Sequence, residues 1–166
     1  MPSIADLTNE ITVARKYTEN FLDNTDTADW FRMPSGGVTH IAWQVGHMAI
    51  AEYGLALKRV RGAQPSDSEL LPNQFMELFG KGSIPDADAS KYPSADEIRN
   101  VFDRVHQQTL EELKTFTDEL LDEPSEPSHP MFQTKRGAIH WAAQHELLHT
   151  GQIALLRRLF GQEWLR

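Results

Sequence analysis

The sequence predicts an all-α protein, a four-helix bundle with a long crossover between helices 2 and 3. Apolar residues recur three or four positions apart along nearly the whole chain, as on one face of a helix. Stretches rich in proline, glycine and serine divide this pattern into four long segments, and one connection, residues 62–93, is unusually long. The 166 residues are interpreted as one domain, 1–166, which is large enough to bury a core.

The first predicted helix begins after Ser3, a favourable N-cap, and ends near Asp23. Its core positions are Ile4, Leu7, Ile11, Ala14, Thr18 and Phe21. The second predicted helix begins near Val38 and ends near Arg61, where Gly62 suits the position just past a helix end. Its core face is predicted to carry His40, Trp43, His47, Ile50, Gly54 and Leu57.

The long connection contains one short predicted helix, at about residues 73–79, which Gly80 ends. Ser94 and Glu97 form a capping box that opens the third helix. Its core stripe is Ile98, Val101, Val105, Leu113, Phe116 and Leu120. Three prolines in residues 123–130 predict a loop, because they forbid a helix, and no convincing pair of strands is present.

The fourth predicted helix begins near Thr134 and ends at Phe160 and Gly161. Its predicted core seam is Ala138, Ala142, His145, His149, Gln152, Leu156 and Leu159. This seam would bury two imidazoles, which costs free energy unless each finds a partner. The shorter connections favour antiparallel neighbours, helix 1 beside helix 2 and helix 3 beside helix 4.

His145 and His149 are four residues apart, so both imidazoles can point to one place beside the helix. This spacing suits two nitrogen ligands of one transition metal. His47 is the natural third ligand if helices 2 and 4 face each other. The alternatives are core histidines satisfied by carbonyls or carboxylates, and a haem held between two histidines. His140 points elsewhere, and His40 is expected to be partly exposed near a pocket mouth.

Glu146 is the candidate catalytic residue, as a general base, although it could instead orient a ligand or pair with a cation on another helix. His145 to His149 matches the short motif of zinc peptidases, but the downstream ligand of those enzymes is missing. A ferritin-like di-iron site is excluded because Gln44 stands where a second Glu is required. Trp43 could form an apolar wall for a substrate, with Phe75, Met76 and Phe79 as a lid.

The composition excludes several classes of protein. A net charge of −8 disfavours binding to nucleic acid, and no apolar run reaches membrane-spanning length. The first residues lack the features of a signal peptide, so a cytoplasmic protein is expected. Because cysteine is absent, the chain offers no disulfide, no thiolate ligand and no nucleophilic thiol.

The stretch Trp43-Gln44-Val45-Gly46-His47-Met48-Ala49 precedes His145-x-x-x-His149-Thr150-Gly151-Gln152-Ile153. With these two motifs the chain resembles the DinB-like (DinB/YfiT) superfamily of metal-binding four-helix bundles over essentially its whole length. The resemblance implies one divalent metal ion, often zinc or nickel, bound by His47, His145 and His149 with positions left open. It also implies chemistry that depends on low-molecular-weight thiols such as bacillithiol or mycothiol.

The leading hypothesis is therefore a metal-dependent enzyme, a thiol S-transferase or a hydrolase, that acts on a small-molecule substrate. Glu146 is its candidate catalytic residue, and Trp43 and Gln152 are its candidate substrate-binding residues. The alternative is a non-catalytic module that holds a small ligand or buffers metal. A homodimer is expected from the resemblance and from spare apolar residues on the fourth helix, Trp141, Leu148 and Leu155.

Overall fold

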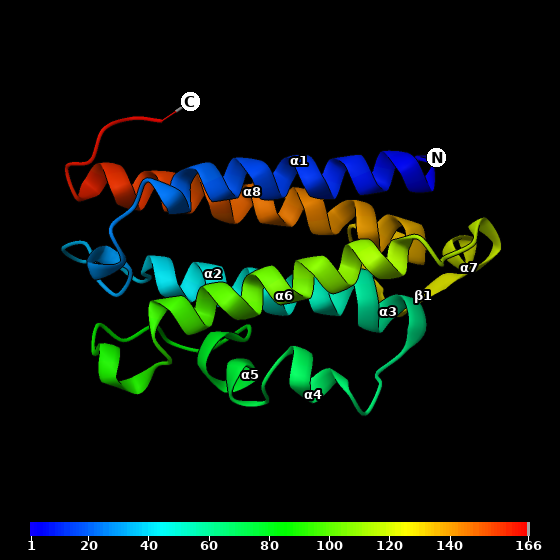
Figure 1. Cartoon of the computed structure of the whole chain (residues 1–166), viewed down its shortest axis with the longest axis horizontal. Helices are drawn as coiled ribbons and strands as arrows, with labels where there is room; N and C mark the ends of the chain where they lie inside the picture. Colours follow the sequence, from blue (N-terminus) through cyan, green and yellow to red (C-terminus); the bar gives the residue numbers. More distant parts are fainter. Residues whose placement is uncertain (166) are drawn as a thin grey trace.

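The protein is mostly helical, and four long helical segments lie side by side along its length (Figure 1). They are α1 (Ile4–Asp23), α2 (Ile41–Glu52) with its continuations η2 (Tyr53–Lys58) and α3 (Arg59–Arg61), α6 (Ala95–Leu113) and α8 (Lys135–Leu159). This computed structural model describes residues 1–165. The predicted all-α class is confirmed, with the addition of one small sheet.

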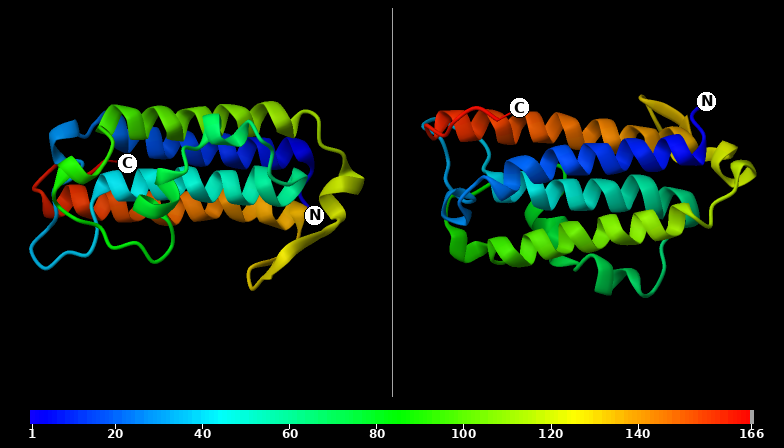
Figure 2. Two further views of the ribbon diagram at one scale, coloured as in Figure 1. Left: turned by 90° about the horizontal axis from the view of Figure 1, so that it is seen from below. Right: turned by 45° about the horizontal axis from the view of Figure 1, so that its top comes forward.

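The four segments are not arranged as the sequence predicts. α1 and α8 run in one direction, and α2 and α6 run in the other (Figures 1 and 2). α1 packs mainly along α8, and α2 packs along both α6 and α8. α1 and α2 therefore lie diagonally across the bundle, as do α6 and α8, and the expectation that each of these pairs are neighbours is wrong. Their connections, residues 24–40 and 114–134, are long enough to cross the end of the molecule.

Side-chain caps set where the helices begin. Ser3 and Asp6 form a capping box at α1, and Ser94 and Glu97 form another at α6, as predicted. α2 starts three residues later than predicted, because Nδ1 of His40 caps it by accepting the Trp43 amide N–H at 3.0 Å. His40 is fully buried, so the expectation that it is partly exposed is wrong.

Acidification is expected to destabilise the metal-free protein through His40. Burial lowers the pKa of His40 to about 4, whereas a histidine in an unfolded chain titrates near about 6.5. The unfolded state therefore binds more protons between these values, and the free energy of unfolding falls as pH drops from 6.5 to 4. His40→Asn keeps a capping oxygen without the titration. Urea unfolding in the presence of a chelator measures the free energy of unfolding at each pH. Its slope against pH should be smaller in this variant by up to about 1.4 kcal/mol per pH unit. An unchanged slope would show that His40 does not cause the acid destabilisation.

Only part of each predicted seam on α2 and α8 is buried. From these seams the core contains Ala138, Ala142 and Leu156 of α8, as well as His40 and Leu57, but the predicted ligand histidines lie beside the most buried positions. On α8 the buried residues include Ile139, Ala143, Glu146, Thr150 and Ile153, whereas His145 and His149 are half-buried. On α2 the buried residues include Ile41, Gln44, Val45, Met48 and Glu52, whereas Trp43 and His47 are half-buried. His47, His145 and His149 therefore lie at the edge of the core, where a small molecule can reach them.

The long connection carries α4 (Asp67–Leu70), α5 (Gln74–Phe79) and η3 (Ala89–Lys91), and it returns along the outside of α2 and α6 (Figure 1). α5 confirms the predicted short helix. Its residues Phe75 and Phe79 are buried in the core beside α2, and only Met76 is exposed. The expectation that these three residues form a lid is therefore wrong.

The remaining connections contain short elements. η1 (Thr27–Asp29) lies between α1 and α2, and α7 (Asp118–Asp122) follows α6. β1 (Pro124–His129) and β2 (Phe132–Thr134) form an antiparallel hairpin before α8, so the expected absence of strands is wrong. The prolines exclude a helix but are tolerated in an edge strand. No helix among residues 1–165 has the length and apolarity that crossing a membrane requires.

Candidate metal centre

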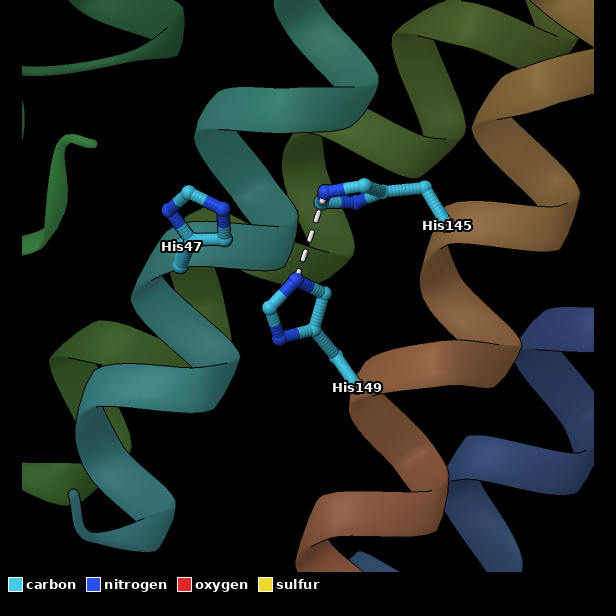
Figure 3. Close-up of side chains that lie close together, drawn as sticks. All are labelled: His47, His145 and His149. Atoms are coloured by element: carbon cyan, nitrogen blue, oxygen red, sulfur yellow. Dashed lines mark hydrogen bonds between the residues drawn. The ribbon is translucent and has the colours of Figure 1, made fainter. Parts of the chain in front are cut away.

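The structure brings the three predicted ligands together between α2 and α8 (Figure 3). One ring nitrogen from each of His47, His145 and His149 lies within 4.8 Å of the other two. The Nε2 atoms of His145 and His149 are 3.3 Å apart. Two nitrogens bound to one tetrahedral metal at about 2.0–2.1 Å are themselves about 3.3 Å apart. The spacing of this pair therefore fits a shared ion.

Hydrogen bonds orient two of the three rings. Nδ1–H of His47 donates to the Phe79 carbonyl oxygen at 2.8 Å, and Nδ1–H of His149 donates to Oε1 of Gln44 at 2.5 Å. A neutral imidazole carries one proton, so these bonds assign the Nε2 lone pairs to the shared space. Metal-binding histidines are commonly held in this way. Nδ1 of His145 is buried without a partner among the described residues.

Burial keeps the three imidazoles neutral near pH 7. It lowers the pKa of His145 to about 4 and of His149 to about 3, with a further contribution from the neighbouring histidines. The pKa of His47 is also lowered by burial, which its hydrogen bond to Phe79 only partly offsets. Neutral imidazole is the form that binds metals. The donor set, its orientation and its protonation thus all fit a divalent cation.

Close packing between α2 and α5 creates the contact that orients His47. Gly46 has no side chain, and a Cβ there would lie 2.4 Å from the Phe79 ring. This close approach brings the Phe79 carbonyl to His47. The indole of Trp43 stacks on the His47 imidazole, with centroids 4.7 Å apart and planes inclined by 7°. Its N–H donates to Oγ of Ser83 at 2.8 Å, so the long connection supports His47 from two sides.

Gly46→Ala is expected to disturb this support without touching a ligand. The new methyl group displaces the Phe79 ring, which costs about 1–3 kcal/mol of stability, and lengthens the bond from His47 to the Phe79 carbonyl. Loss of such an orienting bond typically weakens metal binding about 10- to 100-fold. The measurement is competition with a chromophoric chelator. Gly151→Ala is the matched control, because no atom lies within 4 Å of its added Cβ; equal affinities in the two variants would contradict the argument.

Glu146 does not join the histidine cluster. Its carboxylate accepts hydrogen bonds from Nε of Arg15 at 3.0 Å and Nη2 at 3.3 Å, in the buried core. Arg15 also pairs with Glu52 at 2.8 Å, and Nδ1 of His106 lies 3.0 Å from the same Glu52 carboxylate. Of the three roles considered for Glu146, the structure thus favours pairing with a cation on another helix.

The two candidate substrate-binding residues also lie elsewhere than expected. Trp43 stacks on His47 and does not line the cavity beside the cluster, and Gln152 is exposed on α8. Gln44 orients His149, a role that was not predicted from the sequence, where this residue was considered only as the position of an absent carboxylate. Its position three residues before His47, on the inward side, was the available signal. The role of the Phe79 carbonyl could not be predicted from the sequence, because every residue carries a backbone carbonyl.

A cavity of about 470 Å³ opens beside the cluster, with His47 and His145 in its wall. This volume is within the range of small-molecule sites. Gly54, Leu55 and Trp141 give it an apolar surface, and the β1–β2 hairpin closes one side. No atom lies within 4 Å of the place where a Cβ of Gly54 would be, so this glycine leaves room in the cavity. The other expected small residues, Ala138 and Ala142, are packed in the core instead.

The helical fold and the three clustered imidazoles define a candidate metal-binding protein of the α class. A family model described as the DinB superfamily matches residues 10–153, which is most of the chain. The chain belongs to the DinB superfamily, and the predicted family is confirmed. A comparison with curated proteins gives no match.

Proposed function

We propose that this protein is a metal-dependent enzyme that transfers a low-molecular-weight thiol to an electrophilic small molecule. His47, His145 and His149 would hold one divalent ion, zinc or nickel. The observation that carries the proposal is the cluster itself: three neutral imidazoles, two of them oriented by hydrogen bonds, in the wall of a cavity of about 470 Å³. Three histidines leave a coordination position open, which is typical of catalytic sites.

Family membership supports the remaining parts of this proposal. We propose that the whole chain is one domain. Its four long segments would then be the four-helix bundle of the superfamily, and residues 62–93 would be the crossover. The chain contains no cysteine, so the reacting thiol must come from a small molecule.

The chemistry is divided between the ion and the chain. When bound, a divalent metal lowers the pKa of a coordinated thiol or water, so that a nucleophile forms near neutral pH. Gln44 and the Phe79 carbonyl hold His149 and His47 in place. Leu55 and Trp141 offer the apolar surface on which an electrophile can rest. In the transfer, sulfur bonds to the electrophilic carbon, the leaving group departs with its electron pair, and the thiol proton passes to solvent.

The test is elemental analysis of protein purified without added metal, followed by turnover of 1-chloro-2,4-dinitrobenzene with a panel of thiols. We expect one metal ion per chain and thiol-dependent turnover that His145→Ala abolishes. Thiol-independent cleavage of a nitrophenyl ester would instead indicate a hydrolase. Full metal binding with no turnover of either substrate would indicate a module that binds a ligand or buffers metal.

We also propose that the protein is a homodimer. Leu148 and Leu155 are 58% and 53% exposed on the outer side of α8. Trp141 does not belong to this surface, because it lines the cavity. A monomer mass by light scattering at micromolar concentration would refute the dimer.

A further inference from the structure

The wall of the cavity beside the histidine cluster is positively charged, although the chain as a whole carries a net charge of −8. Lys58, Arg59 and Lys81 contribute cations to it, and Glu126 contributes the one carboxylate. The side-chain ammonium groups of Lys58 and Lys81 form no ion pair or hydrogen bond with any other residue in 1–165. Most of the other basic side chains described have such partners. These two ammonium groups are therefore available to a ligand.

Arg59 has a different task from the two lysines. Its guanidinium donates to the Pro127 carbonyl at 2.6 Å and to Oγ of Ser125 at 3.2 Å. It also lies 5.2 Å from the centre of the Phe132 ring. These contacts attach the β1–β2 hairpin to α3. Arg59 thus fixes one wall of the cavity and adds to its positive potential.

His129, on the hairpin, adds a hydrogen-bond donor to the same wall. Its Nδ1 accepts the Met131 amide N–H at 3.2 Å, so in the neutral ring the proton is on Nε2. Burial and the nearby charges of Arg59 and Lys81 lower the pKa of His129, which keeps the ring neutral at pH 7. No described residue accepts a hydrogen bond from this Nε2.

The backbone explains how these groups come to one place. Residues Tyr53–Lys58 are π-helical, and such segments, which are rare, often occur at functional sites. In this segment and its continuation, Gly54, Leu55, Lys58 and Arg59 all line the cavity. Lys81 arrives from the long connection, two residues after the end of α5. Apolar surface and positive charge thus adjoin His47 and His145.

We propose that this cavity binds a small organic molecule through its carboxylate group, held by Lys58, Lys81 and Nε2–H of His129, with its apolar part on Leu55 and Trp141. The inference rests on the proposed function and names the substrate class of that site. A carboxylate accepts charge-assisted hydrogen bonds from all three donors. The bound molecule then lies beside His47 and His145, where the proposed thiol transfer takes place.

The experiment compares phenylacetate with phenylacetamide, which differ in charge and little in shape. Isothermal titration calorimetry on the metal-loaded protein is expected to show phenylacetate binding about tenfold more tightly. Lys58→Gln/Lys81→Gln should remove this preference. Lys16→Gln/Lys114→Gln removes the same charge from exposed sites outside the cavity and should retain it.

A carboxylate can also bind a metal directly, so the titrations are repeated after chelation. A preference for phenylacetate that survives in Lys58→Gln/Lys81→Gln, or that disappears from the parent protein on chelation, would place the anion on the metal and overturn the inference. Equal affinities in the parent protein, or no binding of either compound at millimolar concentration, would also overturn it. Failure of the proposed function appears separately, in elemental analysis and thiol turnover, since the charge preference is expected in chelated protein too.

Discussion

Replacing His145 or His149 with alanine is expected to abolish metal binding, whereas His140→Ala should retain one ion per chain. The two ligands supply Nε2 atoms 3.3 Å apart, and losing either leaves only two imidazoles to hold the ion. His140 faces Glu10, with Nδ1 2.6 Å from its carboxylate, and is 41% exposed. Elemental analysis after desalting decides the matter. If the His145→Ala variant still bound one ion per chain, His145 would not be a metal ligand.

The same variants connect the metal to stability. An ion that binds only the folded chain stabilises it, by about 2.7 kcal/mol when its free concentration is 100 times the dissociation constant. Chelation should therefore lower the melting temperature of the parent protein and of His140→Ala. It should leave His145→Ala unchanged, because that variant has no ion to lose. An equal shift in all three would show that the chelator acts elsewhere.

The ligands could be predicted because helical spacing and residue type together restrict the geometry. Histidines at positions 145 and 149 share a side of any helix that contains them. His47 followed once α2 and α8 were assumed to face each other, as they do. Gln44 orients His149 from 105 residues away, a contact that no local pattern contains. The Phe79 carbonyl depends on how α5 packs on Gly46, which is a tertiary fact.

The errors in the fold have equally specific causes. On α8 the series through Ala138, Ala142 and His145 competes with the series through Ile139, Ala143 and Glu146, one position along. Hydropathy favours the first, because it counts a buried glutamate as improbable. Ala138 and Ala142 are buried too, but at the next turn Glu146 is buried and His145 is only half-buried, because Arg15 on α1 reaches Glu146. The helix neighbours were predicted wrongly for a similar reason. The length of a connection limits the distance that it can span, but it does not determine which of the other helices packs beside the next one.

The second large effect is expected from Arg15, which is 2% exposed and lies between α1, α2 and α8. Its guanidinium contacts the carboxylates of Glu52 and Glu146, and it covers the face of the Phe102 ring at 3.3 Å. Arg15→Met preserves much of the volume but leaves two buried carboxylates without their shared cation. Breaking such a buried pair costs about 3–5 kcal/mol. Arg32→Met, at a 53% exposed side chain, is the control and should cost about 0.5 kcal/mol or less.

The pH dependence of Arg15→Met separates lost charge pairing from lost packing. In the parent protein burial alone would raise the pKa of Glu52, but Arg15 and His106 together hold it below its usual value. Burial raises the pKa of Glu146, and Arg15 only partly opposes this. Without Arg15 both pKa values rise, so these two carboxyls bind more protons in the folded variant than in its unfolded chain, and their contribution stabilises the variant relative to the parent as pH falls. Urea unfolding with a chelator should therefore show the deficit of Arg15→Met shrinking as pH falls from 7 toward 5. A deficit of the same size across this range would assign the loss to packing around Phe102 instead.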